Sequence, residues 1–227
     1  MGKLLTVAFV FAIAGGMLCF YNSPLLLPDI TQVQRILPEN VKETVDDASK
    51  KIADGVENEF SKATADYKPK FDSKRIEQLI LEYTNDERVF YELKSLEPDS
   101  ELAKVARGHS SDMAQREYFA HQTPEGLSPT DRAKKADYSC VKFYGIYYTD
   151  GVAENLAQNW LYNSYRMKGN YMSYNWHTEE TLAKEMVDGW MDSPGHRKNM
   201  LHEDFDKLGV GVVIAENDAV YATQNFC

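Results

Sequence analysis

Histidine is the residue type in this chain with the widest range of chemistry, and five histidines are present. They are His109, His121, His177, His196 and His202. No two of them form the His-Glu-x-x-His arrangement that places two metal ligands on one helix face, and no Cys-x-x-Cys occurs. A glycine-rich phosphate loop and a Gly-x-Ser-x-Gly elbow are also absent. The sequence therefore contains none of the short motifs of zinc, phosphate or serine-hydrolase sites.

The segment Trp190–Arg197 reads Trp-Met-Asp-Ser-Pro-Gly-His-Arg and places a histidine just after a predicted helix end. Pro194 and Gly195 are typical of such an end and of the tight turn that follows it. Ser193 lies close to His196, which invites a serine-hydrolase interpretation. A serine nucleophile also needs an oriented base and an oxyanion hole, and nothing else in the sequence supplies them. We therefore do not expect Ser193 to be a nucleophile.

Two further polar residues have structural interpretations. His109 lies on a predicted helix twelve residues before His121. We expect it to make a buried hydrogen bond to the backbone, with membership of a cleft as the less favoured alternative. Arg132 is expected to pair with an acid or with a helix C-terminus rather than with a ligand.

The segment 158–177 is rich in aromatic side chains. They are Trp160, Tyr162, Tyr165, Tyr171, Tyr174 and Trp176. We interpret this segment as a long loop between a strand and a helix, and such loops commonly carry function. Tyrosine and tryptophan suit ligand or protein contacts, because they bury apolar area and keep a polar group. The alternative is that half of these side chains pack on the sheet.

The N-terminal segment 1–21 predicts export. Lys3 precedes an uncharged run of 17 residues, Leu4–Phe20. The run fits a signal peptide cleaved after residues 12–14, or a signal anchor that remains as a short membrane helix. A lipid-modified Cys19 is a weaker third interpretation. We favour the anchor, because residues 22–72 read as a tether with an amphipathic stalk helix, and a stalk is useful only if its base is held. The chain is then membrane-anchored on the extracytoplasmic side, or secreted if residues 1–14 are removed.

Charge and cysteine content limit the partners and indicate one covalent link. The net charge of −10 disfavours nucleic acid as a partner, because phosphate binding needs a basic face. Cys140 and Cys227 are the cysteines of the exported part. Thiols tend to oxidise outside the cytoplasm, so we expect a Cys140–Cys227 disulfide, with two unpaired thiols as the alternative.

The residues after the tether, 73–227, are predicted to fold as one domain of the α+β class. Apolar periodicity predicts helices over 73–93, 99–119, 128–136 and 178–190. Strands are predicted over 152–158, 208–214 and 220–226, and the last two are joined by a tight turn at Asn217-Asp218. The stalk helix before the domain is predicted from apolar residues spaced three and four apart, beginning at Val41 and ending at Ala63.

Several motifs occur in a characteristic order along this domain. They are Ala106–Ala114 (Ala-Arg-Gly-His-Ser-Ser-Asp-Met-Ala), Tyr118–His121, Ser128–Arg132, Ala153–Ala157 (Ala-Glu-Asn-Leu-Ala), Trp190–Leu201, Gly209–Gly211 and Tyr221–Phe226. In this order they resemble the SCP-like domain of the CAP superfamily, which includes cysteine-rich secretory proteins, antigen five and plant pathogenesis-related proteins. The short prokaryotic members are the most similar. The resemblance covers residues 74–227 and implies an α-β-α sandwich with a small antiparallel sheet.

The resemblance also implies a cleft in which two histidines and two acids meet. His121 and His196 match the histidines, and Glu154 matches the acid that precedes an asparagine in the family's motif. The second acid falls on Ser193 in this chain, and Asp192 lies next to it. The set of four is therefore incomplete.

The matched cleft residues allow three kinds of chemistry. Two neutral imidazoles and one carboxylate can hold a divalent metal such as zinc, with His121 and His196 as ligands. They can equally hold a water molecule by hydrogen bonds. In the third interpretation Glu154 pairs with the histidines and ties a strand to two loops, and its neighbour Asn155 belongs to the same motif.

Three functions follow from these observations. The first, which we favour, is a binding module whose cleft and aromatic segment engage a cell-envelope component, a lipid or another protein. The second is a metal-assisted hydrolase, such as a peptidase, with Glu154 as general base. The third is a structural envelope protein that self-associates through its stalk helix. Because the second acid is missing, we favour a role other than catalysis.

Overall fold

The computed structural model describes residues 43–44, 46–56, 68–168 and 171–227 of the chain. The predicted apolar segment 1–21 and most of the tether lie outside these residues. Residues 43–44 and 46–56 are helical, in the region predicted to form the stalk helix. No helix in the described part of the chain is long and apolar enough to cross a membrane.

A four-stranded sheet forms the centre of the domain, and its strand order is β1-β7-β8-β4. β7 (Lys207–Ile214) and β8 (Ala219–Phe226) form an antiparallel hairpin, and β8 also pairs antiparallel with β4 (Ala153–Trp160). The two-residue β1 (Glu97–Pro98) runs parallel to β7. The predicted turn between β7 and β8 holds Asp218 at φ 70°, a left-handed conformation that aspartate tolerates.

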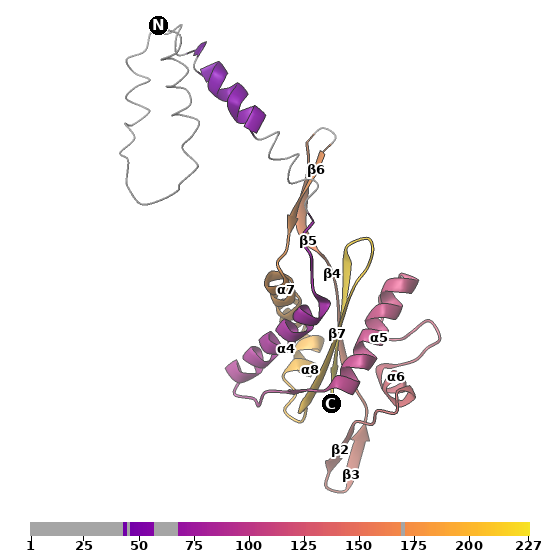
Figure 1. Ribbon diagram of the computed structural model, residues 1–227. Helices are drawn as coiled ribbons and strands as arrows, with labels where there is room; N and C mark the ends of the chain where they lie inside the picture. The colour runs from indigo at the N-terminus through magenta and orange to yellow at the C-terminus, as the bar shows by residue number, and fades with distance from the viewer. Residues whose placement is uncertain (1–42, 45, 57–67, 169–170) are drawn as a thin grey trace. The chain divides into compact units, whose positions relative to one another are not determined.

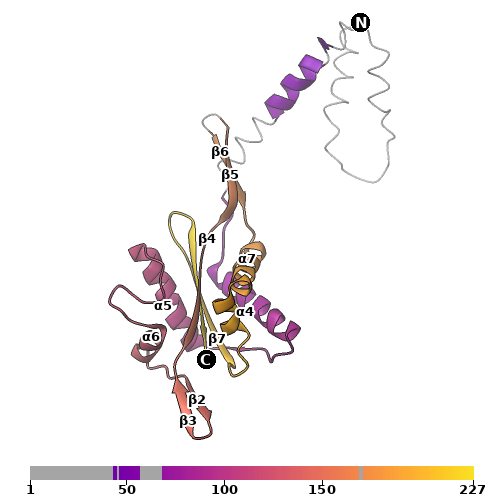
Figure 2. The ribbon, with the colours of Figure 1, turned by 180° about the vertical axis from the view of Figure 1, so that it is seen from behind.

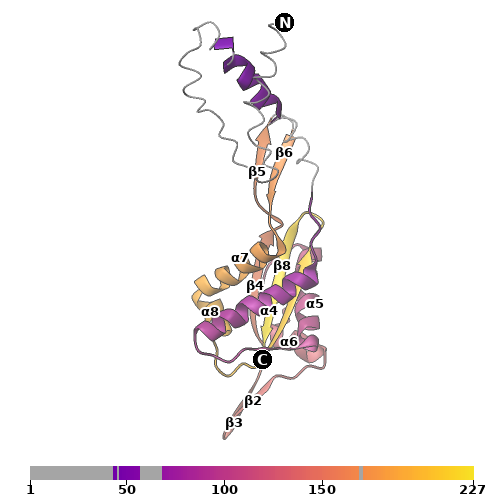
Figure 3. The ribbon, with the colours of Figure 1, turned by 60° about the vertical axis from the view of Figure 1, so that its left-hand side comes forward.

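Helices cover both faces of this sheet, which gives the predicted α-β-α sandwich (Figures 1, 2 and 3). α4 (Ser73–Phe90), α7 (Glu179–Asp192) and α8 (Pro194–Met200) lie on one face. α5 (Ser100–Arg116) and α6 (Pro129–Lys135) lie on the other. All three buried hydrophobic clusters, with the residues packed against them, are formed within residues 71–227. Residues 68–227 therefore carry a hydrophobic core of their own.

Side-chain caps fix where four of the described helices begin. The side chains of Asp72, Asp99, Ser128 and Thr178 accept hydrogen bonds from the first turns of α4, α5, α6 and α7. α5 ends earlier than predicted, because Glu117 adopts the left-handed conformation at φ 55°. Phe119, predicted to lie within this helix, therefore lies beyond it and is exposed. The loop that follows carries one of the histidines matched to the cleft.

α5 packs closely on β7 because two glycines of that strand leave room for its backbone. A Cβ atom at Gly211 would lie 2.1 Å from the backbone nitrogen of Arg107, and one at Gly209 would also meet α5. Ser110 strengthens the same contact by donating from Oγ to the Gly211 carbonyl oxygen at 2.9 Å. The Gly-Val-Gly sequence therefore fixes how closely α5, and with it His109, approaches the sheet.

Two further hairpins are present. β2 (Val141–Tyr144) pairs with β3 (Tyr147–Asp150), and β5 (Tyr162–Lys168) pairs with β6 (Tyr171–Trp176). The prediction of a long aromatic loop over 158–177 is therefore wrong, because this segment ends β4 and then forms the β5–β6 hairpin. Tyrosine and tryptophan are favoured in strands, where their side chains pack against cross-strand neighbours.

Cys140 and Cys227 form a disulfide, which confirms the predicted pairing, and their Cα atoms lie 5.6 Å apart. Cys140 immediately precedes β2, and Cys227 immediately follows β8. The Cys227 carbonyl oxygen also accepts hydrogen bonds from the backbone N–H groups of Asp206 and Lys207. The base of the β2–β3 hairpin is thus joined covalently to the central sheet.

Candidate functional site

Glu154 is the centre of a cluster of polar side chains, and both of its carboxylate oxygens accept hydrogen bonds within it. Its side chain projects from β4 and is only 1% exposed. Oε1 accepts a hydrogen bond from Nδ1 of His121 at 3.0 Å, and Oε2 accepts one from Nη2 of Arg132 at 2.5 Å. The guanidinium provides the positive charge that a buried carboxylate requires.

α6 positions this guanidinium. A capping box between Ser128 and Asp131, with proline at the first helical position, fixes the start of the helix. Nη1 of Arg132 also donates to the carbonyl oxygens of His121 at 2.7 Å and Leu127 at 3.0 Å. One arginine therefore ties the loop between α5 and α6 to Glu154.

His109 approaches the same carboxylate from α5. Its ring is buried, and Nε2 donates to the carbonyl oxygen of Ala120 at 3.0 Å while lying 3.9 Å from Oε1 of Glu154. Burial lowers the pKa of His109, although the charge of Glu154 opposes this effect. His109 thus makes a backbone hydrogen bond and also lies beside the carboxylate of Glu154.

His121 and His196 come together around the edge of the sheet. β4 is an edge strand, so the loop after α5 and helix α8, which lie on opposite faces, can meet beside it. The centres of the two rings are 6.5 Å apart. The His121 side chain is 52% exposed. Burial, followed by the nearby His121, lowers the pKa of His196.

Asn155 explains how α8 is held at this edge. Side chains alternate along a strand, so Asn155 points to the face opposite Glu154. Its Nδ2 donates to the carbonyl oxygen of His196 at 3.1 Å and to Oε1 of Gln224, also at 3.1 Å. Asn199 donates from Nδ2 to Oδ1 of Asn155 at 2.9 Å and to the Glu154 carbonyl oxygen at 3.2 Å. Sequence reasoning did not identify Asn199 and Gln224 as partners of Asn155, although both lie in motifs that it had singled out.

Ser193 and Asp192 lie at the junction of α7 and α8. Ser193 ends one helix and begins the next, and its side chain makes no capping hydrogen bond. Asp192 is the last residue of α7 and is exposed. Within the described residues, neither side chain is hydrogen-bonded to Glu154 or to a histidine, so neither takes the place of the missing second acid.

Asn225 is a further residue beside Glu154 that sequence reasoning missed. It lies opposite Glu154 in the β4–β8 register and is fully buried. Its amide nitrogen and oxygen, Nδ1 of His109 and Nε of Arg132 are buried without a partner among the described protein atoms. Buried polar atoms in folded proteins are normally hydrogen-bonded to protein, water or ligand. These atoms therefore give the Glu154 region an unusual capacity for further hydrogen bonds.

The donor set does not fit a catalytic zinc ion. Such sites use three protein ligands and an open position. Here Arg132 and His121 engage the Glu154 oxygens, so of the matched residues the imidazoles of His121 and His196 are left as metal ligands. In the described part of the chain, no group of three or more His, Cys, Asp or Glu side chains is arranged to hold a metal. Metal binding by His121 and His196 remains a prediction, and no reaction step is derived from it.

Five rings of the predicted aromatic segment form one cluster, which consists of Trp160, Tyr162, Tyr165, Tyr174 and Trp176. The centre of the Tyr174 ring lies 4.9 Å from those of Tyr162 and Trp176. Trp176 packs against the core, whereas Trp160 and Tyr165 are exposed. Tyr171, the sixth aromatic residue of the segment, is not among the side chains that the structure describes. The aromatic cluster therefore buries part of its area and offers the rest to solvent.

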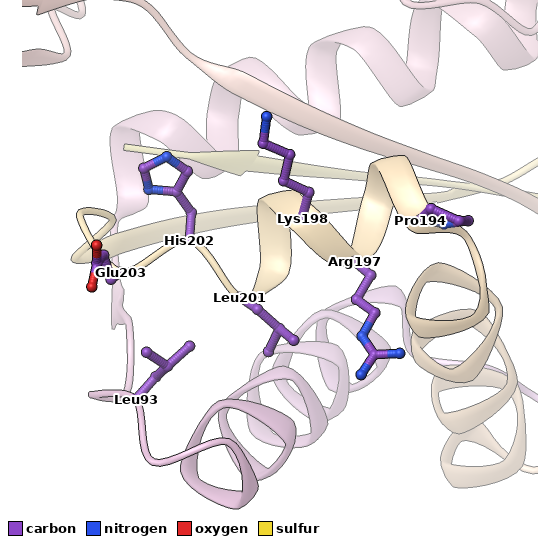
Figure 4. A pocket seen from close by; sticks show the side chains of 7 residues that line it. All are labelled: Leu93, Pro194, Arg197, Lys198, Leu201, His202 and Glu203. Atoms are coloured by element: carbon purple, nitrogen blue, oxygen red, sulfur yellow. The ribbon is translucent and has the colours of Figure 1, made fainter.

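Arg197 serves a different surface from its neighbour His196. It lies over the Tyr91 ring, 5.1 Å from its centre, and donates to the Tyr91 hydroxyl oxygen at 2.7 Å. Figure 4 shows this side chain beside Leu201 at a pocket of about 560 Å³. The buried Arg88 shapes the pocket by donating to backbone carbonyls that include those of the adjoining residues 94, 200 and 202.

Comparison with known proteins places this architecture in one family. The family model of the cysteine-rich secretory protein family (CAP) matches residues 81–226. In Bacillus subtilis, the uncharacterized protein YkwD is 34% identical over 148 residues, which is 65% of this chain and 46% of YkwD. The uncharacterized membrane protein YlbC is 33% identical over 165 residues, which is 73% of this chain and 38% of YlbC. The chain thus spans less than half the length of either relative.

Solved structures are also similar to this chain. An outer surface protein of Borrelia burgdorferi is 20% identical, with a TM-score of 0.51 over 70% of this chain and 97% of that one. An extracellular protein of Bacillus anthracis that contains an SCP domain is 28% identical, with a TM-score of 0.49 over 70% of this chain and 44% of that one. The family match extends from within α4 to the end of β8, so the chain belongs to the cysteine-rich secretory protein (CAP) family.

Proposed function

We propose that this protein is an extracytoplasmic binding module that holds a cell-envelope component, a lipid or another protein at the edge carrying His121 and His196. The observation that carries this proposal is the engagement of both Glu154 oxygens. A general base must accept a proton from water at hydrogen-bond distance. Glu154 is instead paired with Arg132 and His121, which supports a role in shaping the cleft.

The chemistry offered to a ligand comes from the two imidazoles. Because Nδ1 of His121 donates to Glu154, Nε2 is the nitrogen left for a ligand, and it accepts a hydrogen bond when the ring is neutral. The lowered pKa of His196 favours its neutral form at pH 7. A neutral polar ligand suits this pair better than a cation. The exposed rings Trp160 and Tyr165 provide a second contact surface.

The proposed location follows from the relatives and from the N-terminal sequence. One relative is described as a membrane protein, and a neighbour in structure is described as extracellular. Segment 1–21 would anchor the chain, with residues 22–72 holding the domain on the outer side of the membrane. The disulfide agrees with an oxidising compartment.

Binding of immobilised residues 68–227, which carry their own core and exclude the proposed anchor, to peptidoglycan, to phospholipid vesicles and to an envelope protein extract, each in a separate arm, tests this function. The His121→Ala/His196→Ala variant should bind at least about 10-fold more weakly, which corresponds to about 1.4 kcal/mol. Lys198→Ala, on the same helix as His196 and exposed, is the matched control. Trp160→Ala/Tyr165→Ala separates the aromatic surface from the histidines. Absence of binding in all arms, or equal binding by the histidine variant, would reject the proposal.

The metal-assisted alternative is tested separately by calorimetric titration with zinc. Metal held by the two imidazoles should disappear in His121→Ala/His196→Ala and persist in Lys198→Ala. Heat changes that are the same in all three proteins would end this alternative. Self-association through the stalk is tested by sedimentation of chains with and without residues 41–66, and identical monomers would exclude it.

A further inference from the structure

The β2–β3 hairpin extends beyond the end of the central sheet in all three views (Figures 1, 2 and 3). Its register pairs Val141 with Asp150 and Tyr144 with Tyr147, which leaves a two-residue turn. Gly145 occupies the first turn position at φ 73°, where a residue without a side chain is favoured. Ile146 is therefore the apex of a tight and well-defined turn.

The outer half of this hairpin, residues 143–148, is apolar and uncharged. It reads Phe-Tyr-Gly-Ile-Tyr-Tyr, in a chain of which 26% of the residues are charged. Phe143 is 78% exposed and Ile146 is fully exposed. Tyr147 and Tyr148 are 60% and 64% exposed. Turn positions normally hold Gly, Asn, Asp or Ser, so isoleucine at the apex contradicts the usual preference of an exposed turn.

Both faces of the hairpin contribute to this apolar tip. Phe143 lies opposite Tyr148 on one face, with ring centres 6.0 Å apart. Tyr144 lies opposite Tyr147 on the other face, with stacked rings 5.2 Å apart. A groove on a protein partner covers one face of a hairpin, whereas a bilayer surrounds its tip. The distribution of apolar side chains favours the bilayer.

The base of the hairpin is rigidly held. The Cys140–Cys227 disulfide lies at its root, and Gly151 donates from its backbone to the carbonyl oxygen of Cys140 at 3.0 Å. Lys142 donates to Asp206 at 2.8 Å, and the Tyr144 hydroxyl donates to Asp204 at 2.9 Å. A tip fixed in this way loses little conformational entropy on binding.

We propose that the tip formed by residues 143–148 inserts into the headgroup region of a lipid bilayer. The tyrosine rings would lie at the interface, where aromatic side chains with a polar group concentrate, and Phe143 and Ile146 would reach below it. Lys142 and Asp150 at the base set the limit of insertion. From Phe143 to the apex the chain covers roughly 7–10 Å at about 3.4 Å per residue, which matches the roughly 5–10 Å depth of the interface.

The same geometry predicts the kind of lipid. A hairpin has unpaired backbone groups along its outer edges, so it can enter only the hydrated part of the bilayer. The chain carries a net charge of −10, and the inserting tip has no lysine or arginine. Binding should therefore occur on neutral phosphatidylcholine vesicles and should resist high salt. It uses neither His121 nor His196, so it is independent of the proposed function.

Vesicle flotation of residues 68–227 tests the insertion, because this part carries its own core and excludes segment 1–21. The decisive variant is Phe143→Asp/Ile146→Asp. Loss of one apolar side chain from the bilayer corresponds to roughly a 10- to 100-fold change in the vesicle–water partition coefficient. The double variant should therefore lower this partition coefficient by at least about 100-fold. Val89→Asp/Phe90→Asp, exposed apolar residues at the end of α4, is the matched control and should leave binding unchanged.

The outcomes separate the bilayer from other occupants. Near-UV circular dichroism confirms folding, and Ile146→Asn alone, with an expected loss of about 10-fold, replaces the double variant if the latter does not fold. The proposal is overturned if the wild type does not bind neutral vesicles, or if the hairpin variant binds as the wild type does. It is also overturned if binding needs anionic lipid and disappears at high salt. A dimer that depends on Phe143 and Ile146 without vesicles would identify a second copy as the occupant instead.

Discussion

Replacing Arg132 by methionine should reveal how strongly the stability of the domain depends on one ion pair. The substitution removes the only side chain in the described part of the chain with a full positive charge that contacts Glu154. Methionine retains much of the apolar volume of the arginine stem. The Glu154 side chain would remain 1% exposed on β4, as an uncompensated buried charge.

The expected loss is large because a buried charge, once unpaired, is poorly solvated. Removing one partner of a buried ion pair typically costs about 3–5 kcal/mol. The lost hydrogen bonds to the His121 and Leu127 carbonyl oxygens add less, because His121 is exposed and its carbonyl can bind water, and the Leu127 carbonyl still accepts from the Thr123 N–H. We expect the free energy of unfolding at pH 7 to fall by about 3–5 kcal/mol, out of the 5–15 kcal/mol typical of a domain.

Urea denaturation at pH 7 of Arg132→Met and of a double variant measures this loss and its cause. Arg132→Met/Glu154→Gln, which removes both charges, should recover about 1.5 kcal/mol or more of the additive loss.

Two results would refute this reasoning. If Arg132→Met costs less than about 1 kcal/mol at pH 7, the pair behaves as a solvent-screened surface bridge. If Arg132→Met/Glu154→Gln recovers none of the additive loss, the loss comes from the loop contacts rather than from the charge on Glu154. Lys134→Met, which removes an exposed cation of α6 that pairs with Asp150, is the control and should lower the stability far less than Arg132→Met does.

Three further predictions concern the framework of the domain. Replacing both Cys140 and Cys227 by serine should lower the free energy of unfolding by about 4 kcal/mol, because the disulfide closes a loop of 87 residues; a loss below about 1 kcal/mol in urea denaturation would contradict this. Gly211→Ala should lower the free energy of unfolding by about 3 kcal/mol, because its Cβ would meet the α5 backbone. A Cβ at Gly108 has nothing within 4 Å, so Gly108→Ala should stabilise α5 by about 0.5–1 kcal/mol. Equal effects of the two substitutions would contradict the close packing of α5 on β7. Burial lowers the pKa of His109, so below the usual value of about 6.5 the unfolded chain binds this proton more readily than the folded chain. The free energy of unfolding should therefore fall as pH decreases from 7 to 5, by at most about 1.4 kcal/mol per pH unit. His109→Gln should flatten this pH dependence, and an unchanged slope would assign it to other groups.

Local signals made much of the fold predictable. Apolar spacing gave the main helices, and Asp99 and Thr178 have the side chains that cap α5 and α7. The Asn217-Asp218 pair indicated the β7–β8 turn. Each of these features depends on residues close in sequence, so a single sequence carries enough information to place it.

The two smaller hairpins were harder to predict. The strands of β2–β3 are short, and the many aromatic residues of β5–β6 suggested a binding loop rather than strands. The aromatic residues of 158–177 drew attention to ligand binding, although Gly169-Asn170 between two tyrosine-rich runs is also a hairpin signal. The β2–β3 turn has isoleucine at its apex, which no turn rule favours. Pairing in both hairpins became evident only when partner strands were seen side by side.

The surroundings of Glu154 could not be predicted, because they depend on a contact between elements. His121, Glu154 and His196 were matched to the reactive residues of a known family. The contact that joins Arg132 of α6 to Glu154 of β4 links residues that are 22 positions apart in sequence. This contact forms only when α6 is placed beside β4 in the folded chain, and apolar spacing or capping signals carry no information about that placement. The capping box of α6, which is a local signal, fixes where the helix begins, whereas the partner of Arg132 is fixed by tertiary packing.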